Sequence, residues 1–323
     1  MSRLQFLPLA LLLVAPRIEA RAQVLAPADR TALVDSLASA LARRYVAADV
    51  GARMAADLRA RAARNAYAGL SAHDLSSQLT SDLRAIAHDK HLRVVYRPGE
   101  PAEEDERDEA GREAWVREAN YGIGKVEILQ GNVGLLELNG FLPPDLVRAA
   151  LLDAMRKLAG VDALIVDLRR NGGGNPETVA LVSTLLFPRG KRIHLNDLYW
   201  REGDRTDHFY TDAELDIPRI SGPVYVLTSS YTFSAAEEFT YNLKQLKRAT
   251  QVGEMTGGGA NPGGGVRLPA GFGVFLPTGR AVNPYSHDNW EGKGCVPEVP
   301  TDAASALETA HRLALEKLGK AGT

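Results

Sequence analysis

The chain has 323 residues, 38 basic and 40 acidic side chains, a formal net charge of −2 and one cysteine. This near balance of charge argues against a nucleic-acid partner or an anionic membrane surface, both of which select strongly basic proteins. The single cysteine, Cys295, excludes an intrachain disulfide, so stability must come from a hydrophobic core, which a chain of this length can bury in one or two domains.

Residues 1–22 have the pattern of a secretory signal peptide. A basic residue, Arg3, precedes an apolar run from Leu4 to Val14, and a small-x-small sequence ends at Ala22. A run of about a dozen apolar residues is too short to span a bilayer, which takes about 20. No cysteine that could carry a lipid anchor follows it. We therefore expect an exported chain, periplasmic or extracellular after cleavage near Ala22, with no integral membrane span.

Residues 23–96 are predicted to form a small domain of three helices. The second helix is expected near residues 50–66, and the third begins after Ser71, where Ser71-x-x-Asp74 resembles a capping box. Leucines at helical spacing mark the first and third helices: Leu33, Leu37 and Leu41, then Leu75, Leu79 and Leu83. Residues 97–120 are predicted to be a charged linker or surface excursion, because proline, glycine and an acidic run favour solvated chain.

Residues 121–323 alternate between strand and helix patterns, which predicts an α/β domain with a mainly parallel sheet. After a glycine-rich region at residues 253–298, a terminal helix is expected at residues 303–318. The expected strands and helices before it are, in order, strand 133–138, helix 144–158, strand 163–168, helix 177–186 and strand 224–227.

Ser234 lies where the last of these strands gives way to a helix with Phe239 and Leu243 on one face. A serine in this place can be a helix cap. It can also be a nucleophile held out at the edge of the sheet, with the free N–H groups of the helix start beside it. Those N–H groups, among them that of Ala235, suit the oxyanion of an acyl-transfer intermediate.

A second motif, Asp167 to Gly174, carries a buried strand into three glycines. It is not a phosphate-binding loop, because no Gly-Lys-Ser/Thr follows, and it lacks the spacing of a dinucleotide fingerprint. A glycine N–H in this loop could be one oxyanion donor, with that of Ala235 as the other. The alternative is a tight turn between strand and helix.

A serine nucleophile needs a base, and no histidine is near Ser234 in the sequence. The pair His88-x-x-His91 has roughly helical spacing, but the chain has no His-Glu-x-x-His motif and no cysteine pair. We therefore expect no metal site and no cofactor. The seven candidates for a histidine base are His73, His88, His91, His194, His208, His287 and His311.

Together, five ordered segments resemble the C-terminal processing (tail-specific) serine peptidases, in the branch similar to interphotoreceptor retinoid-binding protein. The resemblance spans residues 28–318 and implies a crotonase-like α/β core with a small N-terminal helical domain and Ser234 as nucleophile. The five segments are Asp89-Lys90-His91-Leu92-Arg93, Gly131-Asn132-Val133-Gly134, Asp167 to Gly173, Phe233-Ser234-Ala235-Ala236-Glu237 and Gly253 to Gly259.

The chain departs from the processing peptidases in two ways. A PDZ module usually stands between the helical and catalytic parts, where this chain has only the acidic linker. A lysine base is usual in the glycine-rich segment, where residues 255–260 contain none, and Lys244 and Lys247 on the helix after Ser234 cannot simply replace it. The tricorn branch of the same family uses serine with histidine and glutamate.

By resemblance to the tricorn branch, His91 is the expected base and Glu291 the residue that orients it. The expected oxyanion donors are the N–H groups of Gly173 and Ala235. The first hypothesis is an exported serine peptidase that acts on peptides or unfolded chain ends. The alternative, from the retinoid-binding relative, is a non-catalytic or weakly catalytic binding protein for apolar small molecules or peptides. The sequence indicates no oligomeric state.

Overall fold

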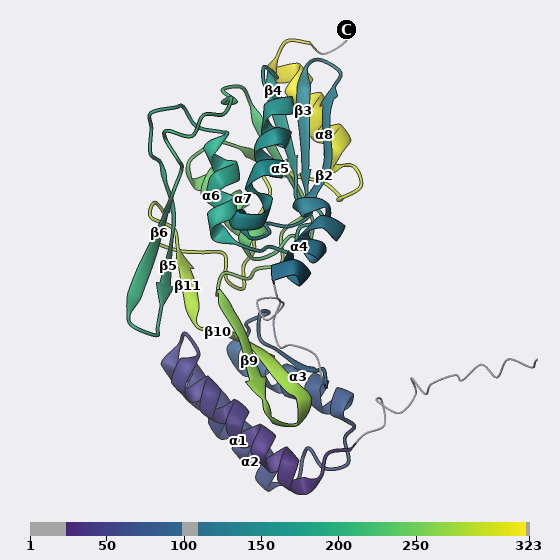
Figure 1. Ribbon diagram of the computed structural model, residues 1–323, viewed down its shortest axis with the longest axis vertical. Helices are drawn as coiled ribbons and strands as arrows, with labels where there is room; N and C mark the ends of the chain where they lie inside the picture. The colour runs from purple at the N-terminus through teal and green to yellow at the C-terminus, as the bar shows by residue number, and fades with distance from the viewer. Residues whose placement is uncertain (1–23, 99–108, 321–323) are drawn as a thin grey trace, which may run out of the picture.

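The computed structural model describes residues 24–98 and 109–320 (Figure 1). The predicted signal peptide and most of the acidic run in the predicted linker lie outside the described residues. The linker region contains one described helix, α4 (Glu109–Glu118). Within the described ranges, no helix combines the length and the apolar character needed to cross a bilayer.

The N-terminal part consists of the three expected helices, α1 (Pro27–Arg44), α2 (Ala48–Ala63) and α3 (Ala72–Ala87). Ser71 caps α3, because its hydroxyl oxygen accepts a hydrogen bond from the backbone N–H of Asp74 at 3.2 Å. The chain then turns out of α3 and enters a short strand, β1 (Arg93–Tyr96).

The helices share one hydrophobic core with a small antiparallel sheet, in the order β1-β10-β9. Strands β9 (Gly263–Leu268) and β10 (Phe272–Pro277) come from the glycine-rich region far along the chain. Their hairpin extends from the α/β part and lies along the helices (Figure 1). The hydrophobic core of the helical part therefore includes a hairpin that lies, in sequence, after the predicted linker at residues 97–120. The core combines Leu33, Leu37, Leu41 and Leu83 with Phe272, Val274 and Leu276.

The larger part is built on a six-stranded sheet in the order β12-β8-β7-β4-β3-β2. All neighbours are parallel except β2, which runs antiparallel to β3. The strands are β2 (Ile123–Leu129), β3 (Val133–Leu138), β4 (Ala163–Asp167), β7 (Val224–Thr228), β8 (Thr250–Gly253) and β12 (Val299–Pro300).

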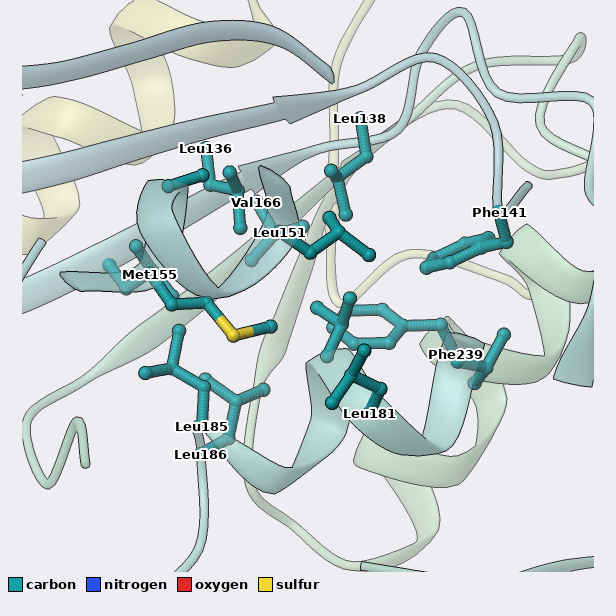
Figure 2. Packing of buried hydrophobic residues seen from close by; sticks show 14 of the residues in the cluster. Leu136, Leu138, Phe141, Leu151, Met155, Val166, Leu181, Leu185, Leu186 and Phe239 are labelled. Carbon is teal, nitrogen blue, oxygen red and sulfur yellow. The ribbon is translucent and has the colours of Figure 1, made fainter. Parts of the chain in front are cut away.

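Helices cover both faces of this sheet, which confirms the predicted α/β class. On one face lie α5 (Pro144–Lys157), α6 (Pro176–Thr184) and α7 (Ala235–Gln245), and on the other lies α8 (Ala306–Lys317). Burial on both faces explains why the central strands are continuous apolar runs. Figure 2 shows the packing under the first face, with Leu136, Leu138 and Val166 of the sheet against Leu151, Met155 and Phe239 of the helices.

A third sheet of three antiparallel strands, in the order β11-β5-β6, flanks the α/β part. It contains β5 (His194–Trp200), β6 (Arg205–Tyr210) and β11 (Gly279–Val282). The first two strands have no counterpart among the elements expected from the sequence. Their hairpin extends away from the central sheet on the same side as α6 and α7 (Figure 1).

Candidate active site

Ser234 occupies the last position before α7, at the end of the turn that follows β7. Its backbone has φ 54° and ψ −121°, a conformation that is costly for a residue with a Cβ atom and that recurs where a nucleophile is presented on a sharp turn. The turn is tied to the glycine loop by two hydrogen bonds. The Thr232 hydroxyl donates to the carbonyl of Leu168 at 2.9 Å, and the N–H of Phe233 donates to that of Asn171 at 3.2 Å.

His91 meets Ser234 across the molecule. Its Nε2 atom lies 3.0 Å from Ser234 Oγ, although the residues are 143 positions apart. The imidazole packs against the rings of Phe233 and Phe275, with centroids at 4.5 and 5.6 Å, and the backbone N–H of His91 donates to Asp89 Oδ1 at 2.9 Å. Burial lowers the pKa of His91 below its ordinary value, so the ring is neutral at neutral pH and can accept a proton.

Glu291 lies close to His91 and Asp89, but its carboxyl group is not hydrogen-bonded to His91. One atom from each of Asp89, His91 and Glu291 lies within 4.8 Å of the others. Both His91 Nδ1 and Glu291 Oε1 are buried without a hydrogen-bond partner among the described residues, while Glu291 Oε2 accepts from the N–H of Ala260 at 2.5 Å. Burial, and then the charge of Asp89, raises the pKa of Glu291 to about 8.

Asp89 is a second carboxylate at the imidazole, which the sequence analysis quoted only as part of a motif. Its Oδ1 lies 3.9 Å from His91 Nδ1. Its Oδ2 accepts hydrogen bonds from the Tyr45 hydroxyl and from Asn261 Nδ2, both at 3.0 Å. Asp89 thus connects the histidine to the helical part and to the glycine-rich segment.

The two expected oxyanion donors lie on adjoining pieces of backbone. Gly173 has φ 114°, and a Cβ atom there would come within 2.7 Å of Ser234 Cβ and 3.0 Å of the nitrogen of Ala235, so only glycine lets the loop approach this closely. Ala235 is the first residue of α7, where a backbone N–H has no partner within its own helix. The N–H of Gly173, however, donates to Asn171 Oδ1 at 2.8 Å. This donor is therefore engaged in the structure.

Glu237 holds the turn that carries Ser234 against the glycine-rich segment. Its buried carboxylate accepts four hydrogen bonds: from the N–H of Ser234 at 2.9 Å, the Thr256 hydroxyl at 2.5 Å, and the N–H groups of Gly258 and Gly259 at 2.6 and 2.8 Å. The sequence analysis included Glu237 in a motif without a role. The available signal was its place three residues after the serine, which is the spacing of a capping box.

Two lysines near the turn are engaged elsewhere. Lys90 Nζ donates to the carbonyl of Gly257 at 2.5 Å, and Lys244 Nζ pairs with Glu298 at 3.0 Å. Among the described side chains, the His91 imidazole is the one that lies within hydrogen-bond distance of Ser234 Oγ.

A small pocket opens beside Ser234 and Ala235, with mostly apolar walls that include Leu198 and Trp290. Glu238 lines it as well and is 4% exposed. Burial raises the pKa of Glu238 to about 8, and its Oε1 atom is among the described buried atoms without a hydrogen-bond partner. The pocket is thus apolar apart from a carboxyl group that is largely protonated at neutral pH.

Comparison with known proteins gives family matches for most of the chain. Residues 132–301 match the model described as Peptidase family S41, and residues 22–124 match that of the N-terminal domain of Peptidase S41 in eukaryotic IRBP. The chain is 28% identical over 181 residues to carboxyl-terminal-processing peptidase 1, chloroplastic, of Arabidopsis thaliana. The aligned region covers 55% of this chain and 35% of the relative.

Two further comparisons place the chain by sequence and by fold. It is 31% identical over 97 residues to the tail-specific protease of Haemophilus influenzae, covering 30% of this chain and 13% of the relative. The chain thus spans about a third or less of the length of these curated relatives. A crystal structure described as a putative peptidase from Parabacteroides merdae is similar with a TM-score of 0.64 at 19% identity, covering 90% of this chain and 98% of that one. This likeness concerns the fold.

Proposed function

The chain belongs to peptidase family S41, and on that premise we propose that it is an exported serine peptidase with Ser234 as nucleophile, His91 as base and Glu291 as the residue that orients the base. The observation that carries the proposal is the 3.0 Å approach of His91 Nε2 to Ser234 Oγ. This is the distance at which a neutral imidazole can take the hydroxyl proton as the oxygen attacks.

In the proposed reaction, Ser234 Oγ attacks the carbonyl carbon of a peptide bond while its proton moves to His91 Nε2. The imidazolium then gives the proton to the leaving amine, and water hydrolyses the acyl-enzyme by the same route in reverse. The N–H of Ala235 stabilises the oxyanion. Gly173 supplies the second donor if the Asn171 amide, which now accepts its hydrogen bond, turns aside when substrate binds.

Glu291 is preferred to Asp89 as the orienting carboxylate because of its free oxygen. Both oxygens of Asp89 already accept hydrogen bonds from other groups, whereas Glu291 Oε1 has no partner among the described atoms. A small closing movement would let His91 Nδ1–H donate to Glu291. Such a bond fixes the tautomer in which Nε2 is free to accept the serine proton.

The proposed substrates are peptides or the ends of unfolded chains. The pocket beside Ser234, with Leu198 and Trp290 in its walls, suits a small apolar side chain next to the cleaved bond. The signal-peptide pattern of residues 1–22 supports the proposal of export to the periplasm or the cell exterior.

A fluorophosphonate probe tests the nucleophile directly, because it labels an activated serine covalently. We expect labelling of the wild-type protein and hydrolysis of casein, with both lost in Ser234→Ala. Ser230→Ala, at an exposed serine of the same turn, should retain both. Undiminished labelling of Ser234→Ala would reject the assignment. A folded wild-type protein that neither reacts nor hydrolyses casein would favour the binding-protein alternative.

A further inference from the structure

A cluster of two histidines and an aspartate lies on the β5–β6 hairpin, outside the active site. Asp197 of β5 is directly opposite His208 of β6 in the register of the strands, and His194 is three residues before Asp197. Asp197 Oδ1 lies 2.6 Å from His194 Nε2 and 2.6 Å from His208 Nδ1. One potential ligand atom from each residue therefore converges on the same point.

We propose that His194, Asp197 and His208 bind a divalent transition-metal ion, with Zn²⁺ as the best match. Two imidazole nitrogens and one carboxylate oxygen are a donor set suited to Zn²⁺, and also to Co²⁺ or Ni²⁺. Ca²⁺ and Mg²⁺ instead prefer ligand sets made of oxygen. The search of the sequence missed this group because its members come from two strands that pair only in the fold.

The ion-free geometry is close to that of a bound site. The 2.6 Å separations are hydrogen bonds in which each imidazole N–H points at the carboxylate. Ligand bonds of about 2.0–2.1 Å in a tetrahedral site place neighbouring donor atoms roughly 3.3 Å apart. The two nitrogen–oxygen separations therefore need to open by less than about 1 Å, and the three donor atoms already lie within 4.8 Å of one another. Each imidazole proton moves to the other ring nitrogen so that the facing nitrogen can bind the ion.

The surroundings hold one side of the site and leave the other open. The ring of His194 stacks on Tyr210, with centroids 4.5 Å apart and an interplanar angle of 19°, and its carbonyl accepts a hydrogen bond from the Tyr285 hydroxyl at 3.0 Å. The side chain of His208 is 52% exposed, whereas that of Asp197 is 18% exposed. An ion can thus enter from solvent and keep a water molecule as its fourth ligand.

The ion would join β5 to β6 next to the proposed substrate pocket. Leu198, the residue after Asp197, lines that pocket beside Ser234. We therefore expect the ion to stabilise the hairpin that forms one wall of the pocket. This inference does not depend on the proposed peptidase activity, because its test measures metal binding.

The experiment must separate this cluster from a second group of potential ligands, Asp89, His91 and Glu291, in the active site. The mature chain is stripped with EDTA, dialysed and titrated with Zn²⁺ by calorimetry, and then with Co²⁺, whose visible absorption reports coordination by nitrogen and oxygen. His208→Ala and Asp197→Asn remove ligands of the proposed site. His91→Ala removes one of the active-site group, and His311→Ala removes a histidine outside both groups.

We expect wild type, His91→Ala and His311→Ala to bind one equivalent of Zn²⁺ at the hairpin and to give the same Co²⁺ band. In His208→Ala and Asp197→Asn the dissociation constant should rise at least about tenfold and the band should be lost. Because His208 is half exposed, its variant should stay folded, which circular dichroism in EDTA checks. Wild-type affinity in both hairpin variants, or loss of binding only in His91→Ala, would overturn the proposal, as would a wild-type chain that binds no Zn²⁺.

Discussion

At the scale of single residues, the environment of His91 determines what its ring can do. The imidazole has a serine hydroxyl on one nitrogen and two carboxylates, those of Asp89 and Glu291, near the other. Two buried carboxylates at such close range resist ionising together, so one of them holds its proton to a higher pH. Burial, and then the charge of Asp89, raises the pKa of Glu291.

The first prediction concerns the pH dependence of the proposed hydrolysis. Because burial raises the pKa of Glu291 to about 8, its carboxyl is largely protonated at pH 7 and becomes an anion only as the pH passes 8. The anion stabilises the imidazolium that forms on His91. We therefore expect kcat/KM to rise through an apparent pKa near 8 in the wild type and to be lower, without that step, in Glu291→Gln. The same step in the variant would assign it to another group.

The second prediction concerns stability and the buried carboxyl of Glu238. Burial raises its pKa in the folded protein from the model-compound value of 4.5 to about 8. A raised carboxyl pKa means that the contribution of this group to stability is fully present below pH 4.5 and is lost as the pH rises toward 8, because the unfolded chain releases the proton first. Glu238→Gln, which cannot ionise, should be more stable than the wild type at pH 8, by up to about 4 kcal/mol.

Urea unfolding of both proteins at pH 5 and pH 8 provides the measurement. The advantage of Glu238→Gln should shrink at pH 5, because ionisation of a carboxyl with an ordinary pKa of 4.5 lowers the free energy of the unfolded chain much less at pH 5 than at pH 8. An equal difference at the two pH values would mean that packing, and not protonation, separates the proteins.

Local sequence patterns reveal some of these single-residue features and not others. Ser234 and His91 could be identified because short motifs around them resemble a known family, and their contact follows the expected pairing. The hydrogen bond from the Gly173 N–H to Asn171 could not be predicted from the sequence, because it depends on the rotamer of one amide side chain. The pKa of Glu238 also depends on the other segments that enclose it, which no local pattern reveals.

At the scale of elements, the start of α7 is fastened to the glycine-rich segment by Glu237. Its carboxylate accepts the N–H groups of Gly258 and Gly259, and it also holds the N–H of Ser234. The turn that carries Ser234 and the segment that contacts it are thus positioned by one side chain. The position of Ser234 at the helix cap is therefore compatible with its proposed role as nucleophile, because Ser234 ends the turn and Glu237 holds its N–H.

The third prediction follows from this fastening. Glu237→Ala should leave buried N–H groups at Gly258 and Gly259 without acceptors, at a cost of about 1–3 kcal/mol for each. We expect a clear drop in Tm and a strong loss of fluorophosphonate labelling at Ser234. Glu177→Ala removes an exposed glutamate from the first turn of α6 and is the matched control. Normal labelling and Tm in Glu237→Ala would show that the turn holds its shape by itself.

The elements that sequence patterns predicted are those with strong local signals. Strands β3, β4 and β7 are apolar runs and were expected within a residue or two of their bounds. Strands β5 and β6 were missed, because polar residues such as His194 and His208 dominate them and their pairing comes from a hairpin with a register shift. In this region the fold is decided by contacts between segments, which a pattern along one segment cannot show.

At the scale of the whole molecule, two bodies meet at the proposed site. The helical part supplies His91, and the α/β part supplies Ser234. The β9–β10 hairpin belongs to the α/β part in sequence, but its side chains pack in the hydrophobic core of the helical part. The order of family motifs predicted both bodies and their sequence. It did not predict that the β9–β10 hairpin packs with the helical part, because β1 and β10, which pair with each other, are far apart in the chain.

The fourth prediction concerns separation of the two bodies. A chain limited to residues 121–323 keeps Ser234 but loses His91 and the helices that cover Phe272, Val274 and Leu276. We expect it to aggregate or to bind an apolar dye, and to remain unlabelled by the fluorophosphonate. Full-length His91→Ala lacks the same base but should stay soluble. A difference in solubility between this variant and the 121–323 chain therefore reports the loss of the helical part of the core. A soluble, well-folded 121–323 chain would contradict the prediction.

The 143-residue separation of His91 and Ser234 has a consequence for the life of the chain. During synthesis the base emerges first, the nucleophile much later, and Glu291 only near the end. Under the proposed mechanism, a partly made or partly exported chain therefore cannot cut anything, and completion of folding acts as the activation step.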